Sequence, residues 1–518
     1  MAESFHHQLT VAIDARIKAI NPGDQPVVEI QGALRHLTAL YERIRSLVDY
    51  QDERFIRRLA IRRILIRRLL ILNEAGPVGD GLVLELIRAG YIENGRIPQT
   101  MGHDLDERLT KYRTALPELR RHYQPPELLR LERQLLGVAA AELEDCLDPA
   151  EIELVLTDEL ALECASYLET EVDDALWLVA LRAWLKVDTE LAAWRMISRR
   201  ETALWRQFVN EPTTQLSELI RRIARIDHDL HDRSLDARVR QFARVVPPYL
   251  VLADLAYHAP EETRELMAEP TKLRTFVETM IKRRIAASET KIQRSMVRAT
   301  IYIFISKVIF GLPVEVAYDN AVHGAVNYFP LVVNTLVPPS LMLTAALSLR
   351  PPSVDNTRVL ADRTTTLIRG EERTPLEHSV HHARTRRQSA GVFMLLMVLT
   401  YLIVFGGVIW LLKALSFNLV SSLIFFFFVS IVGFFAFRLR AQARELAVLE
   451  EPEGAFLAIF DFVALPFLRL GRALSITARS LNVVLFFLDF IVEAPLKLVF
   501  VVLEDWFAFL REKREELR

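Results

Sequence analysis

A single lysine, Lys307, lies in the middle of the apolar stretch 299–314 of this 518-residue chain. A charged side chain inside a membrane or an apolar core is costly, so it usually pairs with an opposite charge and often marks a functional site. The alternative is that Lys307 extends its amine along its apolar stem to the edge of a shallow segment. We favour pairing, because four acids in or beside apolar segments also need partners. These candidates are Glu315, Asp319, Asp489 and Glu493.

Three histidines, His378, His381 and His382, match the HxxHH pattern of membrane di-iron desaturases and hydroxylases. Imidazoles at this spacing on a helix can converge on an iron ion. Those enzymes carry further boxes, a separate HxxxH and a second HxxHH, and this sequence has neither. We therefore interpret the triplet as a solvated helix start and expect no metal there.

Five arginines in segment 53–72 fall on one helical face about 140° wide, at 100° per residue. They are Arg54, Arg57, Arg58, Arg62 and Arg68. One interpretation is a basic surface for anionic lipid headgroups or another polyanion. The other is a central helix whose arginines pair with acids from neighbouring helices. We favour the second, because Arg63 and Arg67 lie on the opposite, apolar side.

The sequence contains no P-loop and no GxGxxG, HExxH or GxSxG motif. Its 18 glycines provide little material for phosphate-binding loops. Two cysteines, Cys146 and Cys164, favour a reducing compartment over a disulfide framework. We therefore expect neither an enzyme nor a cofactor.

Long apolar segments must position the candidate residues. The stretches 391–412 and 417–437 are uncharged and about as long as a bilayer-spanning helix, which is roughly 20 residues. A third stretch, 330–349, is also uncharged, although Pro338 and Pro339 should bend it. The stretch 299–314 is short, so it could span with a borrowed turn or re-enter. The pattern predicts about four transmembrane helices.

The distribution of basic residues predicts which side of the membrane each segment faces. Segment 272–298 has eight basic residues and two acids, and 350–390 has eight arginines and five acids. Basic segments next to apolar helices mark the cytoplasmic side. We therefore expect both termini in the cytoplasm, with 315–329 and 413–416 on the other side.

The predicted fold class is all-α, with a helical cytoplasmic domain followed by a membrane domain. In the last part, 481–502, the polar stripe of Asp489, Glu493 and Lys497 favours helices that lie in the membrane interface. The predicted parts are a soluble helical domain 1–270, a basic juxtamembrane helix 271–298, a membrane hairpin 299–349, an arginine-rich cytoplasmic loop 350–390, a transmembrane hairpin 391–437, and interfacial helices with a charged tail 438–518.

Segments 86–98, 291–319 and 489–516 resemble stretches in a group of bacterial multi-pass membrane proteins that have an N-terminal helical cytoplasmic domain and no assigned function. The resemblance implies a bacterial inner membrane and brings no catalytic motif. Our leading hypothesis is a non-enzymatic scaffold that recruits a partner at the cytoplasmic membrane face. The alternative is a transporter or channel component that uses Lys307 and the acids. Expected partners are the lipid bilayer and a protein partner or second copy, and no nucleic acid.

Overall fold

The computed structural model describes residues 2–20, 26–28, 53–185, 187–267, 269–347, 351–370, 390–449 and 464–474. Within these ranges the regular elements are helices, apart from one isolated antiparallel bridge between Val27 and Pro98. The all-α prediction is therefore confirmed. The described chain divides into two compact units, one of residues 2–280 and 358–370, the other of residues 281–357, 390–449 and 464–474.

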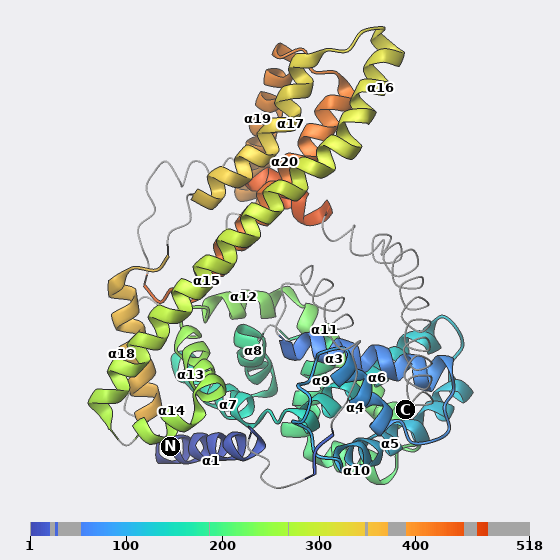
Figure 1. Cartoon of the computed structure of the whole chain (residues 1–518), viewed down its shortest axis with the longest axis vertical. Helices are drawn as coiled ribbons and strands as arrows, with labels where there is room; N and C mark the ends of the chain where they lie inside the picture. Colours follow the sequence, from blue (N-terminus) through green and yellow to red (C-terminus); the bar gives the residue numbers. More distant parts are fainter. Residues whose placement is uncertain are drawn as a thin grey trace, which may run out of the picture. The chain divides into compact units, whose positions relative to one another are not determined.

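The first unit is built from helices that pack on both sides of α6 and α7 (Figure 1). Its helices are α1 (Ala2–Ile20), α3 (Glu53–Leu65), α4 (Gly79–Arg88), α5 (Met101–His122), α6 (Glu127–Leu147), α7 (Glu151–Leu168), α8 (Asp174–Leu185), α9 (Thr189–Arg199), α10 (Thr202–Asn210), α11 (Leu216–His231), α12 (Arg233–Gln241), α13 (Pro247–His258) and α14 (Pro260–Leu266), with a π-helical segment Ile66–Ile71 after α3.

Helix α6 is the centre of this unit because every residue of 135–144 is buried. It packs against α3, α5 and α9. Small residues make this possible: Ala139, Ala140 and Ala141 are fully buried, and a side chain at Gly137 would collide with Glu190 of α9. A helix that is buried on all faces cannot show the one-sided apolar pattern of a surface helix.

Part of the predicted cytoplasmic loop 350–390 is a helix. Helix α18 (Val354–Arg369) buries Leu360, Ala361, Leu367 and Ile368. Leu360 and Leu367, like Ala361 and Ile368, are seven residues apart, so the four lie on one face of the helix, with the buried Thr364 and Thr365 between them. The count of arginines in this segment hid that buried face. The histidine triplet and the remaining arginines of the loop lie outside the described residues.

The second unit contains the apolar helices. They are the later part of α15 (Pro270–Ser306), the π-helical segment Lys307–Gly311, α16 (Leu312–His323), α17 (Tyr328–Leu347), α19 (Ala390–Ala414) and α20 (Leu419–Ala443). Helices α16, α17, α19 and α20 lie side by side (Figure 1), and α20 contacts both α16 and α17. Segment 464–474 is also helical over its whole length.

Four helices of the described chain are long and apolar enough to cross a membrane, which confirms the predicted number. These candidate spans are Lys272–Val322, Tyr328–Ala345, Met397–Ala414 and Leu419–Ala443. Large apolar side chains are exposed along them, for example Leu402 at 67% and Trp410 at 72% on α19. Such a surface is unfavourable in water and favourable in lipid.

The first span differs from the expectation of a short or re-entrant segment ending at Val314. The helical path continues from α15 through the π-helical segment into α16 and ends at His323. Gly324 then adopts a φ of +68°, the left-handed conformation with which glycine commonly ends a helix. Residues 315–323, which we expected in an outside loop, are therefore helical. Glu315 and Asp319, the two acids that suggested a loop, are buried.

The π-helical segment has a local cause. Pro313 follows it and has no N–H to donate to a carbonyl one turn earlier, so the regular ladder is interrupted there. Gly311 adds space beside the lysine, because a Cβ at this position would lie 3.1 Å from Cδ of Lys307. The interruption and the glycine together accommodate the stem of Lys307 inside the helices.

Candidate functional site

Lys307 is buried among the apolar helices, with 1% of its surface exposed. Its Nζ donates a hydrogen bond of 2.8 Å to Oδ1 of Asn334 on α17 and lies 3.5 Å from Oε1 of Glu315. The amine also lies 4.4 Å from the ring centre of Phe428 on α20. The charge therefore has an amide, a carboxylate and an aromatic face as partners, which lower the cost of its burial.

Glu315, on α16, is the acid that meets Lys307 in the described chain. Its Oε1 accepts a 2.7 Å hydrogen bond from Nδ2 of Asn334, and its Oε2 accepts one of 3.3 Å from the hydroxyl of Ser421. The same Nδ2 of Asn334 donates to the Ser421 carbonyl at 3.1 Å. Asn334 thus bridges the two charges, and the π-helical segment, α16, α17 and α20 each contribute one polar side chain.

Asp319, one helical turn after Glu315, belongs to a second layer. Its Oδ1 accepts a 2.5 Å hydrogen bond from Nδ2 of Asn418, and its Oδ2 accepts one of 3.2 Å from the backbone N–H of Asn327. Asn418 also caps α20, since its side-chain oxygen accepts a 2.7 Å hydrogen bond from the N–H of Ser421. Asp319 therefore ties the two inter-helix turns together and is not positioned beside Lys307.

The sequence analysis missed Asn334, Ser421 and Asn418. The apolar stretches were identified by their lack of charged residues, and this criterion does not detect neutral amide and hydroxyl side chains. A polar side chain in a membrane helix tends to hydrogen-bond across to a neighbouring helix. Asn334 is fully buried and would have been visible as the one amide within 330–349.

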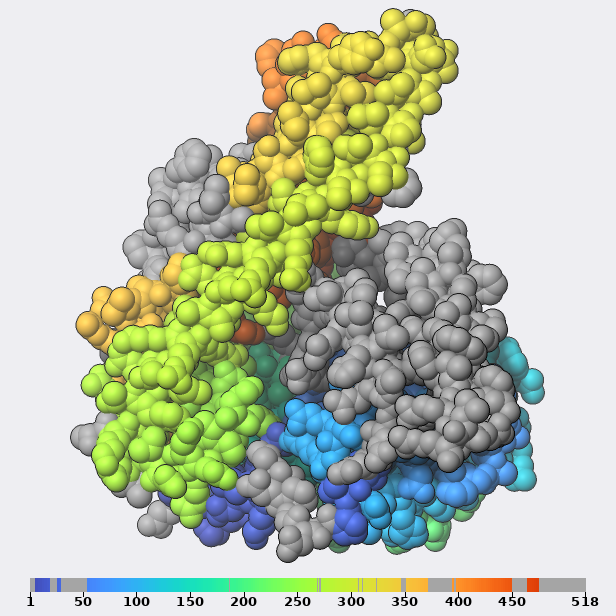
Figure 2. Space-filling view, viewed as in Figure 1, coloured from blue at the N-terminus to red at the C-terminus, as the bar shows by residue number. Residues whose placement is uncertain are grey.

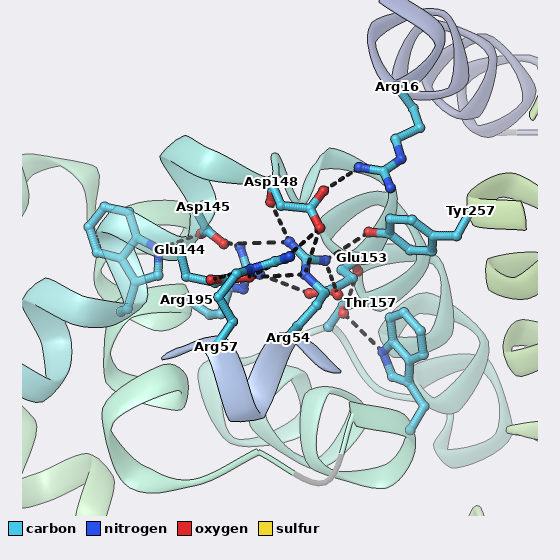
Figure 3. A network of polar contacts seen from close by, with 12 residues as sticks. Arg16, Arg54, Arg57, Glu144, Asp145, Asp148, Glu153, Thr157, Arg195 and Tyr257 are labelled. Carbon is cyan, nitrogen blue, oxygen red and sulfur yellow. Dashed lines mark hydrogen bonds and ion pairs between the residues drawn. The ribbon is translucent and has the colours of Figure 1, made fainter. Parts of the chain in front are cut away.

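The arginine face of α3 lies against acids of the first unit (Figure 3). Arg57 donates to Glu144 of α6 at 2.6 Å and to Asp148 at 2.8 Å. Arg54 pairs with Glu153 of α7 and donates to the hydroxyl of Tyr257 at 3.0 Å.

The other three arginines of this face also have acidic partners. Arg58, only 4% exposed, pairs with Asp188 at 2.7 Å. Arg62 lies 3.1 Å from Glu190, and Arg68 lies 2.6 Å from Glu85. A surface that binds lipid headgroups needs guanidinium groups open to solvent, whereas this face is directed at neighbouring helices.

Arg195 of α9 completes the network on the other side of α6 and α7. It is 2% exposed and pairs with Asp145 at 2.5 Å and with Glu153 at 2.8 Å. Arg16 of α1 pairs with Asp148 (Figure 3). Helices α1, α3, α6, α7 and α9 are thus joined by one set of buried charged side chains, to which α13 adds the hydroxyl of Tyr257. We name this set the arginine network.

Burial and charge act in opposite directions on the acids of the arginine network. Burial raises the pKa of Glu144 to about 6, although the guanidinium of Arg57 opposes this shift. Burial would also raise the pKa of Asp148, but Arg54, Arg16 and Arg57 outweigh it and lower that pKa below its ordinary value. Of these two acids, Asp148 is therefore the one that is more firmly ionised.

Asp489 and Glu493, the other predicted partners of Lys307, lie outside the described residues, as do His378, His381 and His382. Among the described residues, no group of three or more His, Cys, Asp and Glu side chains could hold a metal ion. Both cysteines of the sequence are described and unpaired, Cys164 buried in α7 and Cys146 partly buried in α6.

The buried polar cluster of the second unit is thus made of Lys307, Glu315, Asn334 and Ser421, and we name it the lysine cluster. Its chemistry is that of a charge pair shared through an amide in apolar surroundings. Comparison with known proteins adds no further assignment to this geometry: no family model, no curated protein and no solved structure matches the chain.

Proposed function

We propose that this chain is a non-enzymatic scaffold of a bacterial cytoplasmic membrane, and that its first unit binds a partner protein at the cytoplasmic face. One observation carries this proposal. The candidate spans all begin at Lys272 or later, and the described helices before them form a unit with its own core and internally paired charges. A rigid helical unit attached to membrane helices can present a fixed surface to a partner.

The proposed orientation has both termini in the cytoplasm. It is supported by the eight basic residues of 272–298 and by Arg438, Arg440 and Arg444 at the end of α20. A reporter that is active only outside the cytoplasm, fused after Arg518, should be silent. The same reporter inserted between Gly324 and Ala325 should be active. Activity after Arg518 would reject the orientation.

Purification of the tagged full chain in mild detergent tests the scaffold. We expect a protein partner at fixed stoichiometry that rebinds when both are purified. The first surface to substitute contains Ile71 and Leu72, which at 72% and 58% are the most exposed large apolar side chains of the described first unit. Ile71→Ser with Leu72→Ser should weaken rebinding, and Val11→Ser is the matched control. Absence of any stoichiometric partner would reject the proposal.

A second candidate function, ion or solute transport, is favoured by the lysine cluster. Charged side chains within membrane helices mark transport sites, as do helices interrupted near the middle of a span. Here the π-helical segment and Pro313 interrupt the first span, and Pro338 and Pro339 lie one turn after Asn334 in α17.

Flux through liposomes that contain the purified chain tests this second candidate. We expect flux with the parent chain and none with Lys307→Met. Lys413→Met, which changes an exposed lysine at the end of α19, is the matched control and should behave like the parent. Equal leakage from protein-free liposomes and from those with the parent chain would reject transport.

A further inference from the structure

One face of α15 changes from basic to apolar along its length. Arg294, Arg298, Ile301 and Ile305 lie within roughly 60° of one another at 100° per residue. Both arginines are exposed, and the two isoleucines are 54% and 48% exposed. The same side of the helix therefore offers two exposed cations followed within about one turn by exposed apolar side chains. Figure 2 shows part of the surface of this helix in yellow-green.

Helix α20 also changes from exposed apolar residues to exposed arginine, close to its C-terminal end. Phe437 is 53% exposed, and the next residue, Arg438, is exposed as well. Helices α15 and α20 share one apolar core cluster, which includes Met296 of α15 and Leu439 of α20. One helix of this contact, α15, thus carries Arg294 and Arg298, and the other, α20, carries Arg438.

The helical segment 464–474 adds a fourth exposed arginine. Leu465, 44% exposed, and Arg472 are seven residues apart and so share a helix face. This segment packs on α20, because Gly471 is so close to Ser430 and Phe434 that any side chain there would collide with them. Those contacts lie one to two turns before Arg438. We name the set Arg294, Arg298, Arg438 and Arg472 the arginine belt.

None of the four belt arginines forms an ion pair with a residue that the structure describes. The opposite ends of the same helices are different. Between 310 and 329 there is no lysine or arginine, and between 408 and 420 Lys413 is the one basic residue. Exposed aromatic side chains are present there instead, including Tyr328 and Trp410.

We infer that the arginine belt binds the phosphate groups of anionic phospholipids in one leaflet. A guanidinium group donates two parallel hydrogen bonds to a phosphate, which suits arginine to this ligand. Exposed apolar side chains on the same helical segments, Ile301 and Ile305, Phe437 and Leu465, would contact the acyl chains of the same lipid. This adjacency selects a lipid over a soluble polyanion, which would meet only the cations. The inference does not depend on either proposed function.

Lipid binding by the purified full chain in detergent tests the belt. Fluorescent phosphatidylglycerol and phosphatidylcholine with identical acyl chains are titrated, and the half-saturating concentrations are compared. We expect at least tenfold tighter binding of phosphatidylglycerol. Each arginine near an anionic headgroup contributes about fivefold. The combined variant should lose the preference, and it carries Arg294→Gln, Arg298→Gln, Arg438→Gln and Arg472→Gln.

Two further variants separate a specific belt from a general or structural effect. Lysine at the same four positions should keep most of the preference, because the charge remains. Four exposed arginines of the first unit provide the matched control, which should bind like the parent. They are changed together as Arg133→Gln, Arg206→Gln, Arg225→Gln and Arg233→Gln.

Three results would overturn the inference. The parent chain could bind both lipids equally, the glutamine variant could keep the preference while retaining its helical spectrum, or inorganic phosphate could displace phosphatidylglycerol at equal phosphate concentration. The last result would assign the belt to a free anion. If the combined glutamine variant does not fold, each arginine is changed to glutamine alone, and each single variant should weaken phosphatidylglycerol binding about fivefold. Single variants that all bind like the parent would overturn the inference.

Discussion

In the first unit, Arg54, Arg57 and Arg195 face four carboxylates, whereas in the second unit one ammonium group and one carboxylate meet around the neutral amide of Asn334. Both clusters lie inside helical packing. The arginine network joins six helices, and Arg54, Arg57 and Arg195 each donate to at least two partners. The lysine cluster joins four helical segments and uses one polar side chain from each.

The difference follows from the surroundings of each cluster. A buried ion must recover its lost hydration from its partners, and in the first unit arginine offers five donors to do so. Membrane helices contain few polar groups, and each additional charge makes insertion costlier. A neutral amide supplies both a donor and an acceptor at lower cost. The four changes below test this contrast.

The largest effect is expected from Arg195→Met. Asp145 and Glu153 each lose a buried donor, and breaking such a pair costs about 5 kcal/mol at the upper end of the usual range. Urea unfolding of the full chain followed by tryptophan fluorescence reports on the first unit, because four of the six tryptophans lie between 177 and 205. Arg199→Met, on the same helix, is the control and should cost at most about 1 kcal/mol, because its pair with Asp158 is half exposed.

Lys307→Met should have the next largest effect, about 3 kcal/mol. The loss is smaller than at Arg195 because Asn334 and Ser421 still donate to Glu315. Thermal unfolding of the solubilised protein measures it. Adding Glu315→Gln should restore stability, whereas adding Asp319→Asn should not. A single variant that melts like the parent would show that the charge pair contributes nothing.

Glu144→Gln tests the arginine network through pH. The pKa of Glu144 is raised from 4.5 to about 6 in the folded protein, so the neutral acid is favoured there. Its contribution to stability is therefore complete below pH 4.5 and is lost as the pH rises through about 6. The variant lacks this loss. The difference in the free energy of unfolding between the variant and the parent should therefore rise by about 2 kcal/mol as the pH increases from 4.5 through about 6. Parallel stability curves for both proteins would contradict this prediction.

Asn418→Ser should have the smallest effect, about 1 kcal/mol. Serine keeps an oxygen that can cap α20, and it removes the amide that donates to Asp319. Asp319 retains the N–H of Asn327, so the carboxylate is only partly deprived of donors. Thermal unfolding in detergent measures the change. A loss as large as that of Lys307→Met would mean that the second layer matters as much as the lysine cluster.

The helix content and the four candidate spans could be predicted because they depend on local composition. An uncharged run of about 20 residues favours a membrane helix wherever it lies in a chain. The first span was placed less well. Glu315 and Asp319 looked like loop residues, and only their hydrogen bonds to Asn334, Asn418 and Asn327 make a helix through His323 compatible with an apolar environment.

The sequence by itself determined that Lys307 needs a partner, because an isolated charge in an apolar stretch is costly in any fold. It also determined that segment 53–72 carries five arginines on one helical face. Only the tertiary structure decided that Glu315 and Asn334 meet Lys307, and that Glu144, Asp148 and Glu153 meet the arginines. The reason is that charge pairing depends on distances between helices, which periodicity along one helix does not encode.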